Sequence, residues 1–470
     1  MDEEFAVLHR RDAMMRLGQM GLGALTLPQL LQAESDRREA RRSTNSSSKA
    51  KACILVYLWG GPPQHDTFDL KPHAPEGIRG LFDPIDSVVP GIQVCEHLPQ
   101  IAKHTDKMAI IRSLTHPSNN HEPSVYHTLT GRVNNTLAVP RNARNRRDFP
   151  TLGSIVGYFT PPSGMPASVT IPRPIGHDGV VYSGTHAGFL GPKYDPIETQ
   201  PPAEVNEKAP HSFDLPPGVD EHRLQLRYGL LNTVESMDRA MQQQKATRGL
   251  DSYREQAFRM LTSPEAKRAF RLDDEPAKVR DRYGRNEYGE CFLMARRLIE
   301  SGVRLVTFTW YFVAKDGNVL NVWDNHGGTG SLGGITGYQM LKEFYCLPSL
   351  DQGYSALLDD LSERGLLDET LVAMYGEFGR TPKINPNKGR DHWGACQSAV
   401  LAGGGIRGGQ VYGSSDEHGA YPKSKPVSVE DLHATMFHSM GLSPELEIHD
   451  SENRPYRISE GQPIHELFGT

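Results

Sequence analysis

The sequence predicts an α/β protein, a three-layer α/β/α sandwich whose central sheet is mostly parallel. Two observations lead to this class. Short, continuous apolar runs rich in β-branched and aromatic residues recur along the chain, as in strands that are buried on both faces. Stretches with helical spacing lie between these runs, and strands that alternate with helices form a sheet covered by helices on both sides.

The predicted elements follow in chain order. Strands are expected at 52–59, 108–114, 303–312, 371–375 and 398–402. Long helical stretches are expected at 338–364 and 430–440. Residues from about 220 to 300 are rich in Arg, Glu, Gln and Met with helical spacing, which predicts a helical insertion. Residues 133–220 are dense in Pro and Gly and predict long loops near the site.

The first 50 residues predict an export signal rather than a part of the folded domain. The pair Arg10-Arg11 precedes a weakly hydrophobic, glycine-containing stretch, as in twin-arginine signals, with an ordinary surface helix as the alternative. The stretch is too short and too interrupted to be a stable membrane span. We therefore expect residues 1–50 to be a twin-arginine-type signal and flexible linker, and residues 51–470 to be one domain. The protein would then be periplasmic or extracellular.

The overall composition argues against a nucleic-acid partner. The 470 residues contain 51 Lys and Arg against 57 Asp and Glu, which is a formal net charge of −6. The five cysteines form no Cys-x-x-Cys pair, so they indicate neither a disulfide framework nor a thiolate zinc site. The 19 histidines, several of them beside Asp, Gly or Asn, suit a metal site instead. The oligomeric state has no signal in the sequence.

Acids and histidines follow the first two predicted strands, where an α/β sheet forms its active site. Asp66 and Asp69 come after the first strand, with capping of turns as the alternative interpretation. His121 comes after the second strand, at the start of a predicted helix whose N-terminus favours anions and activates nucleophiles. The alternative is an ordinary helix start with Ser118 or Asn120 as the cap.

Two further groups of the same kind follow later strands. Asp324 and His326 lie two residues apart on a glycine-flanked loop, so both could reach one ion. The last group follows the 371–375 strand and consists of Glu377, Arg380, Asp391 and His392. Such groups are costly to desolvate unless they are paired or bound to a metal, so their repeated placement at strand exits indicates one composite pocket.

We predict that this pocket holds a divalent metal, as one ion or two. The expected ligands are Asp66, Asp324, His326, Glu377, Asp391 and His392. Mixed nitrogen and oxygen ligands favour Zn²⁺ or Mn²⁺, with Ca²⁺ or Mg²⁺ as alternatives, and two ions ~3.5–4 Å apart are common in hydrolytic sites. His121 is expected to be a ligand or a nucleophile, and Arg380 to neutralise an oxyanion.

Four segments resemble those of a known family: GGPPQHDTFDLKP at 60–72, LTGR at 129–132, GEFGRTP at 376–382 and GRDHW at 389–393. On these residues the chain resembles domain-of-unknown-function family 1501, a sulfatase-like branch of the alkaline phosphatase superfamily. The resemblance covers nearly the whole chain from Lys51. It implies an alkaline phosphatase-like form of the predicted sandwich, and metal-dependent hydrolysis of phosphate or sulfate esters.

The resemblance also implies roles for particular residues. The metal-binding Asp that ends the first strand in the superfamily would be Asp66, and the position of the nucleophile falls on His121. Asp324 and His326 would be the pair that binds the first ion, and His392 would be the late histidine.

The chain departs from the superfamily pattern at several of these positions. His121 stands where the superfamily uses Ser, Thr or a modified Cys, and Thr115 stands at the Cys position of a distant echo of the sulfatase signature. Glu377 takes the place of an Asp, and Phe378 takes the place of the histidine that binds the second ion. Because the Cys-x-Pro-x-Arg signature is missing, the sequence argues against a formylglycine mechanism.

Two functions are consistent with these residues. The leading hypothesis is an exported, metal-dependent hydrolase whose substrate is an anionic ester, with sulfated polysaccharide as one candidate. The alternative is a non-catalytic protein that binds carbohydrate or a surface and keeps the same fold, because fold does not imply function.

Overall fold

The computed structural model describes residues 50–134, 145–161, 164–177, 180–199 and 262–469, and the short pieces 220, 223–227 and 258. The expected export signal, apart from Ala50, and most of the first part of the expected helical insertion lie outside the described residues. Within the described part of the chain, no helix is both long and apolar enough to cross a membrane.

A nine-stranded sheet forms the centre of the fold, in the order β16-β4-β15-β12-β1-β9-β5-β8 with β19 beside β4. Its strands are β1 (Ala52–Tyr57), β4 (Met108–Thr115), β5 (Ser168–Ile171), β8 (Ile197–Glu198), β9 (Leu305–Thr309), β12 (Thr370–Tyr375), β15 (Gln397–Ala402), β16 (Gln410–Tyr412) and β19 (Val427–Ser428). All of them run in one direction except β15, which is antiparallel to both of its neighbours, β12 and β4. The predicted mostly parallel sheet is therefore confirmed, and all five predicted strand regions contribute to it.

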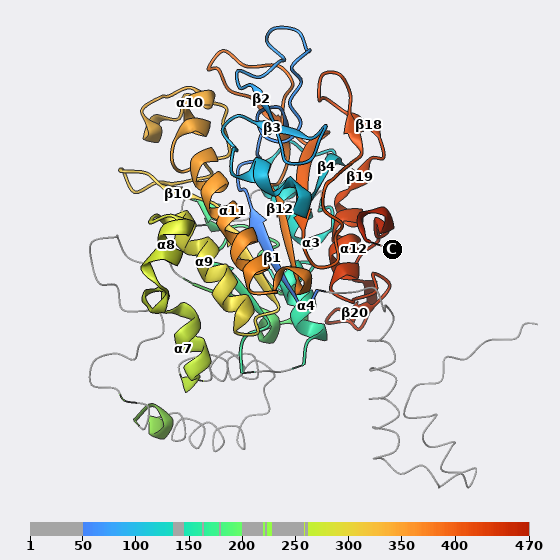
Figure 1. Ribbon diagram of the computed structural model, residues 1–470. Helices are drawn as coiled ribbons and strands as arrows, with labels where there is room; N and C mark the ends of the chain where they lie inside the picture. The colour runs from blue at the N-terminus through green and yellow to red at the C-terminus, as the bar shows by residue number, and fades with distance from the viewer. Residues whose placement is uncertain are drawn as a thin grey trace, which may run out of the picture. The chain divides into compact units, whose positions relative to one another are not determined.

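Helices cover both faces of this sheet (Figure 1). They are α3 (His121–Thr130), α4 (Leu152–Phe159), α7 (Pro264–Phe270), α8 (Ala277–Tyr283), α9 (Glu287–Glu300), α10 (Gly337–Lys342), α11 (Leu347–Glu363) and α12 (Val429–Ser439). Because side chains alternate between the faces of a strand, β1 sends Ile54 and Val56 into a core with α9 and α11, and Leu55 and Tyr57 into a core with α3, α4 and α12. These two cores confirm the three-layer sandwich.

Helix α9 shows that the C-terminal part of the expected helical insertion belongs to one of these layers. Phe292 and Leu298 of α9 are fully buried in the same core as Val306 and Phe308 of β9. The helical spacing of this stretch matches α9, and its apolar positions face the sheet.

The predicted helix at 338–364 is two helices, α10 and α11. Pro348 lies in the first turn of α11. Proline has no N–H to donate and clashes with the preceding turn, so it is tolerated at a helix start but not in a helix interior. The break between Lys342 and Leu347 follows from this residue.

Short two-stranded elements extend beyond the sheet. They are β2–β3 (Pro84–Asp86 and Gln93–Cys95), β6–β7 (Gly176–His177 and Val180–Val181), β10–β11 (Phe312–Val313 and Val319–Leu320), β13–β14 (Gly379–Arg380 and His392–Trp393), β17–β18 (Ser414–Ser415 and Pro422–Ser424) and β20–β21 (Glu447–His449 and Pro455–Arg457). Two of them, β10–β11 and β13–β14, follow the carboxyl ends of β9 and β12 and place polar side chains at that edge of the sheet.

Candidate metal centre

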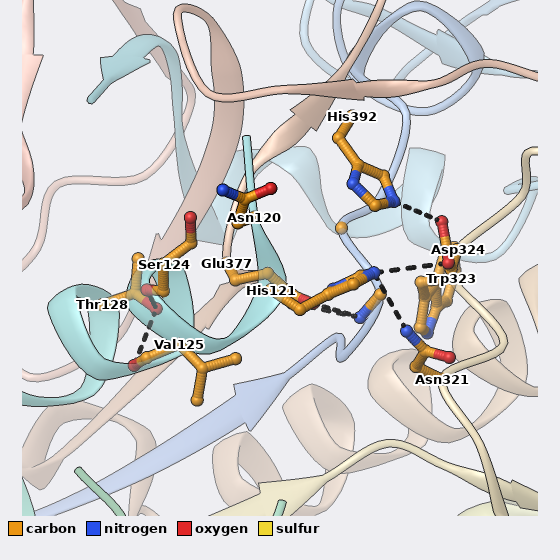
Figure 2. Close-up of polar contacts among 12 residues, drawn as sticks. Asn120, His121, Ser124, Val125, Thr128, Asn321, Trp323, Asp324, Glu377 and His392 are labelled. Carbon is orange, nitrogen blue, oxygen red and sulfur yellow. Dashed lines mark hydrogen bonds and ion pairs between the residues drawn. The ribbon is translucent and has the colours of Figure 1, made fainter. Parts of the chain in front are cut away.

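Three residues that are distant in the sequence bring metal-ligating atoms together at the carboxyl edge of the sheet. One nitrogen each from His121 and His392 and one oxygen from Asp324 all lie within 4.8 Å of one another (Figure 2). Among the described residues this is the one group of at least three His, Cys, Asp or Glu side chains close enough to hold a metal ion.

Different elements position the three side chains. His121 is the first residue of α3, directly after the loop that leaves β4. Asp324 lies in the loop after β11, where its N–H donates to the carbonyl of Asn321 at 2.7 Å. His392 lies on β14, opposite Arg380 of β13. The site therefore depends on the register of a short hairpin as well as on the central sheet.

The two imidazoles have the same orientation toward the carboxylate. His121 donates from Nδ1 to Glu377 Oε1 at 2.7 Å, and its Nε2 lies 3.3 Å from Asp324 Oδ2. His392 donates from Nδ1 to the carbonyl of Asn119 at 2.9 Å, and its Nε2 lies 3.0 Å from Asp324 Oδ1. In both rings the hydrogen bond of Nδ1 selects the tautomer that leaves a lone pair on Nε2.

His326 repeats this arrangement from the more exposed side. Its Nδ1 donates to the carbonyl of Gly327 at 2.8 Å, and its Nε2 lies 3.3 Å from Asp324 Oδ2. Its side chain is 42% exposed, compared with 12% for Asp324. Three imidazoles thus present Nε2 to one carboxylate, and a backbone carbonyl or carboxylate orients each ring from behind. This is the outer-shell arrangement that accompanies metal-binding histidines, so the donor set fits a divalent ion.

The charges around Asp324 keep it ionised. Although burial acts to raise its pKa, Arg380 and the histidines hold the pKa of Asp324 well below its usual range. Burial likewise acts to lower the pKa of His121, but its hydrogen bonds to Asp324 and Glu377 raise that pKa to about 9. Without a metal, a proton therefore fills the place between imidazole and carboxylate that a cation would take.

Glu377 belongs to the layer behind the ligands. Its side chain is fully buried, and its two oxygens accept hydrogen bonds from the N–H of Gly60 at 2.9 and 3.0 Å. It contacts the metal group through His121. Because Gly60 follows the end of β1 and Glu377 follows the end of β12, this carboxylate also links the loops that leave the two strands.

The chain matches one known protein family over most of its length. Residues 50–468 match the family described as "Protein of unknown function (DUF1501)". The chain belongs to this family. The family resemblance inferred from the four motifs is thereby confirmed. No curated protein is a match to the sequence.

Solved structures similar to this DUF1501 chain include sulfatases and a phosphonate monoester hydrolase. A protein of glycosaminoglycan metabolism in Bacteroides thetaiotaomicron is 12% identical, with 89% of this chain and 76% of that chain covered and a TM-score of 0.39. The phosphonate monoester hydrolase of Silicibacter pomeroyi is 14% identical, with 90% and 76% covered and a TM-score of 0.36. A sulfatase from Pseudoalteromonas sp. is 13% identical, with 87% and 70% covered and a TM-score of 0.37. Sequence identities and TM-scores this low say nothing about the activity of the DUF1501 chain.

Four of the six expected ligands lie outside the metal group: His326 and Glu377, described above, and Asp66 and Asp391. Asp66 is fully buried, and its carboxylate accepts hydrogen bonds from Arg390 Nε at 2.7 Å and from the Tyr338 hydroxyl at 2.8 Å. Asp391 is exposed and accepts a hydrogen bond from the Asn385 amide at 2.9 Å. Both carboxylates follow strand exits in the sequence, but the structure of this DUF1501 chain gives them partners within the protein instead.

Arg380 lies behind Asp324, and its guanidinium is fully occupied by partners within the protein. The expectation was that it would neutralise an oxyanion, but its side chain is fully buried. Its guanidinium donates to the carbonyls of Gly60, Gly61 and Trp323 and to that of Arg390, and it pairs with Asp324 Oδ1 at 2.6 Å. A guanidinium held in this way orients Asp324 and keeps its carboxylate ionised. Its donors are used within the protein rather than on an ester.

Phe378 packs against both imidazoles of the metal group. Its fully buried ring lies 4.9 Å from the His121 ring and 4.6 Å from the His392 ring, centroid to centroid. A ring with no donor atom therefore occupies the space beside both imidazoles. Phe378 therefore adds no ligand atom to the group formed by His121, Asp324 and His392.

Sequence reasoning missed Asn119 and Asn321, which contact the histidine rings of the centre, and also Tyr338 and Arg390, which hold Asp66 outside it. Asn119 acts through a backbone carbonyl, which any residue type could supply, so no side-chain pattern could have indicated it. Arg390 lies in the GRDHW segment beside Asp391 and His392, which were the more obvious metal-binding candidates, and its buried pairing with Asp66 becomes apparent only in the structure.

A substitution of Glu377 tests its place behind His121. Glu377→Gln keeps the shape but removes the negative charge behind His121 and replaces one of the two oxygens that accept from Gly60 with a donor, so we expect metal affinity to fall about 10–100-fold, as is typical of outer-shell changes. The measurement is a metal titration in competition with a chelator. Glu369→Gln, at an exposed pair with Lys51, is the matched control. Equal affinities for the two variants would show that Glu377 does not support the centre.

Proposed function

We propose that this chain is an exported, metal-dependent hydrolase of phosphate or sulfate esters, with one divalent ion held by His121, Asp324 and His392. One observation supports the metal most strongly. Imidazole Nε2 atoms converge on Asp324, each ring being oriented through Nδ1 by an acceptor behind it. Two imidazoles and a carboxylate leave coordination positions open, as catalytic sites require.

The donor set also limits which metal ions the site is expected to bind. Imidazole suits zinc and other transition metals, whereas Ca²⁺ and Mg²⁺ prefer oxygen ligands. We therefore propose Zn²⁺ or Mn²⁺ as the resident ion. When bound, such an ion polarises an ester oxygen and lowers the pKa of a bound water.

The protein's own residues hold the centre rigid and anionic. Glu377 and the Asn119 carbonyl fix the two rings, and Arg380 keeps Asp324 ionised. His121 is bonded at both nitrogens, so we propose that it is a ligand rather than a nucleophile. Hydrolysis by an activated water needs no hydroxyl nucleophile, which agrees with the histidine at the position where the superfamily has Ser, Thr or Cys.

The ester class and the export rest on the sequence. Phosphate or sulfate esters follow from the motif resemblance to the alkaline phosphatase superfamily, and export follows from the Arg-Arg stretch near the N-terminus. Sulfated polysaccharide is the substrate that we would test after simple esters.

The test combines metal content with turnover. We expect purified protein to carry about one ion per chain, and to hydrolyse p-nitrophenyl phosphate or p-nitrophenyl sulfate in a chelator-sensitive way. His392→Ala should lower both metal affinity and turnover by at least about 100-fold, since removing a ligand should exceed an outer-shell change. The matched control is His73→Ala, at an exposed histidine outside the metal group. Absence of metal from the wild-type protein, with turnover unaffected by His392→Ala, would refute the proposal.

A non-catalytic binding role is the second candidate, and the orientation of Arg380 favours it. Because this guanidinium is buried and turned to backbone carbonyls, it is not free to stabilise a transition-state charge. The binding role predicts metal-dependent retention on sulfated polysaccharide with no hydrolysis of any ester in the panel.

A further inference from the structure

Asn321 lies against the metal group without an assigned role. It follows β11, and Figure 2 shows its side-chain amide next to the His121 ring. The amide nitrogen lies 3.3 Å from His121 Nε2. Its backbone carbonyl accepts the N–H of Asp324 at 2.7 Å, so the two residues belong to one turn of the backbone beside the centre. The side chain is half-buried, so its polar end is held close to the ligand atoms.

The chemistry of an amide decides which atom faces an ion. Nδ1 of His121 donates to Glu377, so the Nε2 lone pair is the one that a metal takes. An Nε2 atom that binds a cation can accept no hydrogen bond, so the Asn321 amide nitrogen has no partner at that position. An amide nitrogen has no lone pair to offer a metal, whereas the amide oxygen does. Amide O and N are exchanged by a rotation about the last side-chain bond.

We propose that the side-chain oxygen of Asn321 is a neutral fourth protein ligand of the ion in the proposed function. The centre then has two imidazoles, one carboxylate and one amide oxygen. This inference rests on the proposed metal, but it assigns a ligand that neither the motifs nor the family indicate. A neutral oxygen adds a ligand without adding charge, so it adjusts affinity and coordination number together.

The experiment compares leucine substitutions at two asparagines of the same hairpin region. Asn321→Leu removes the oxygen and keeps a side chain of similar size. Asn318→Leu is the matched control, because Asn318 is exposed and its amide bonds with Asp316 and Ser331 in the turn between β10 and β11. Affinity for Zn²⁺ and Co²⁺ is measured by competition with a chelator on the full chain, and coordination by the visible absorption of the Co²⁺ form.

We expect Asn321→Leu to lower the affinity about 10-fold or more, at least as much as an outer-shell change, and to alter the Co²⁺ spectrum. Asn321→Asp, which keeps an oxygen at that place, should retain the wild-type affinity or exceed it. Asn318→Leu should leave both readouts unchanged. If Asn321→Leu binds Co²⁺ with the wild-type affinity and spectrum, the ligand assignment is wrong while the metal centre stands. If the wild-type protein binds neither ion, both the assignment and the proposed function are wrong.

Discussion

Asp324→Asn is expected to abolish stoichiometric metal binding and to destabilise the protein at the same time. The substitution removes the only anionic ligand in the metal group, to which His121 and His392 both turn. It also removes the charge that faces Arg380, whose side chain is 0% exposed and pairs with Asp324 at 2.6 Å. Removing one partner of a buried ion pair typically costs about 3–5 kcal/mol. Since an amide oxygen can still accept from Arg380, we expect a loss near 3 kcal/mol.

Two measurements on one variant separate these effects. Metal content after dialysis should fall from about one ion per chain to almost none, and urea denaturation of the metal-free proteins should report the lost stability. Asp316→Asn, at an exposed carboxylate in the turn between β10 and β11, is the matched control. A variant that still binds one ion with the wild-type affinity would exclude Asp324 from the ligand set.

Asp66→Asn is expected to destabilise the protein strongly without changing its metal content. Asp66 and Arg390 are both 0% exposed, and Arg390 Nε donates to Asp66 Oδ2 at 2.7 Å. The Tyr338 hydroxyl donates to the other oxygen. Neutralising one side leaves a buried guanidinium without its counter-ion, which typically costs about 3–5 kcal/mol. The effect should appear in the free energy of unfolding and in the melting temperature.

Asp391→Asn is the informative comparison for this prediction, because both carboxylates follow strand exits and both looked like ligands. Asp391 is exposed, so we expect its loss to cost less than about 1 kcal/mol. Neither variant should alter metal content. The double variant Asp66→Asn/Arg390→Met should recover part of the lost stability, because the unpaired charge is gone. Loss of metal from a folded Asp66→Asn protein would instead restore Asp66 as a ligand.

The fold was largely predictable because its strands are continuous apolar runs. β1, β12 and β15 are buried along their whole lengths, so every residue in them is under the same constraint and the pattern is easy to detect. The direction of β15 was not predictable. A buried strand has the same composition whether it runs parallel or antiparallel, and only its pairing with β12 and β4 sets its direction.

The metal group was predictable in part because ligands need particular side chains. His121, Asp324 and His392 are residue types that bind metals, and each follows an element that ends at the same edge of the sheet. Asp66 has the same chemistry and the same kind of position, but its partner Arg390 lies 324 residues away along the chain. No local sequence pattern distinguishes a carboxylate that can bind a metal from one that forms a salt bridge with an arginine.

The sequence by itself determined the fold class, the family and the edge of the sheet at which charged side chains gather. The reason is that the polarity and the side-chain chemistry of each position can be read directly from its residue type. The tertiary structure alone decided which of those side chains meet. It placed Asp324 among imidazoles, turned Arg380 inward, paired Asp66 with Arg390 and brought Asn321 to the centre. Hydrogen bonds and ion pairs act over a few ångströms in space, and a strand or helix brings residues from distant parts of the chain to within that distance.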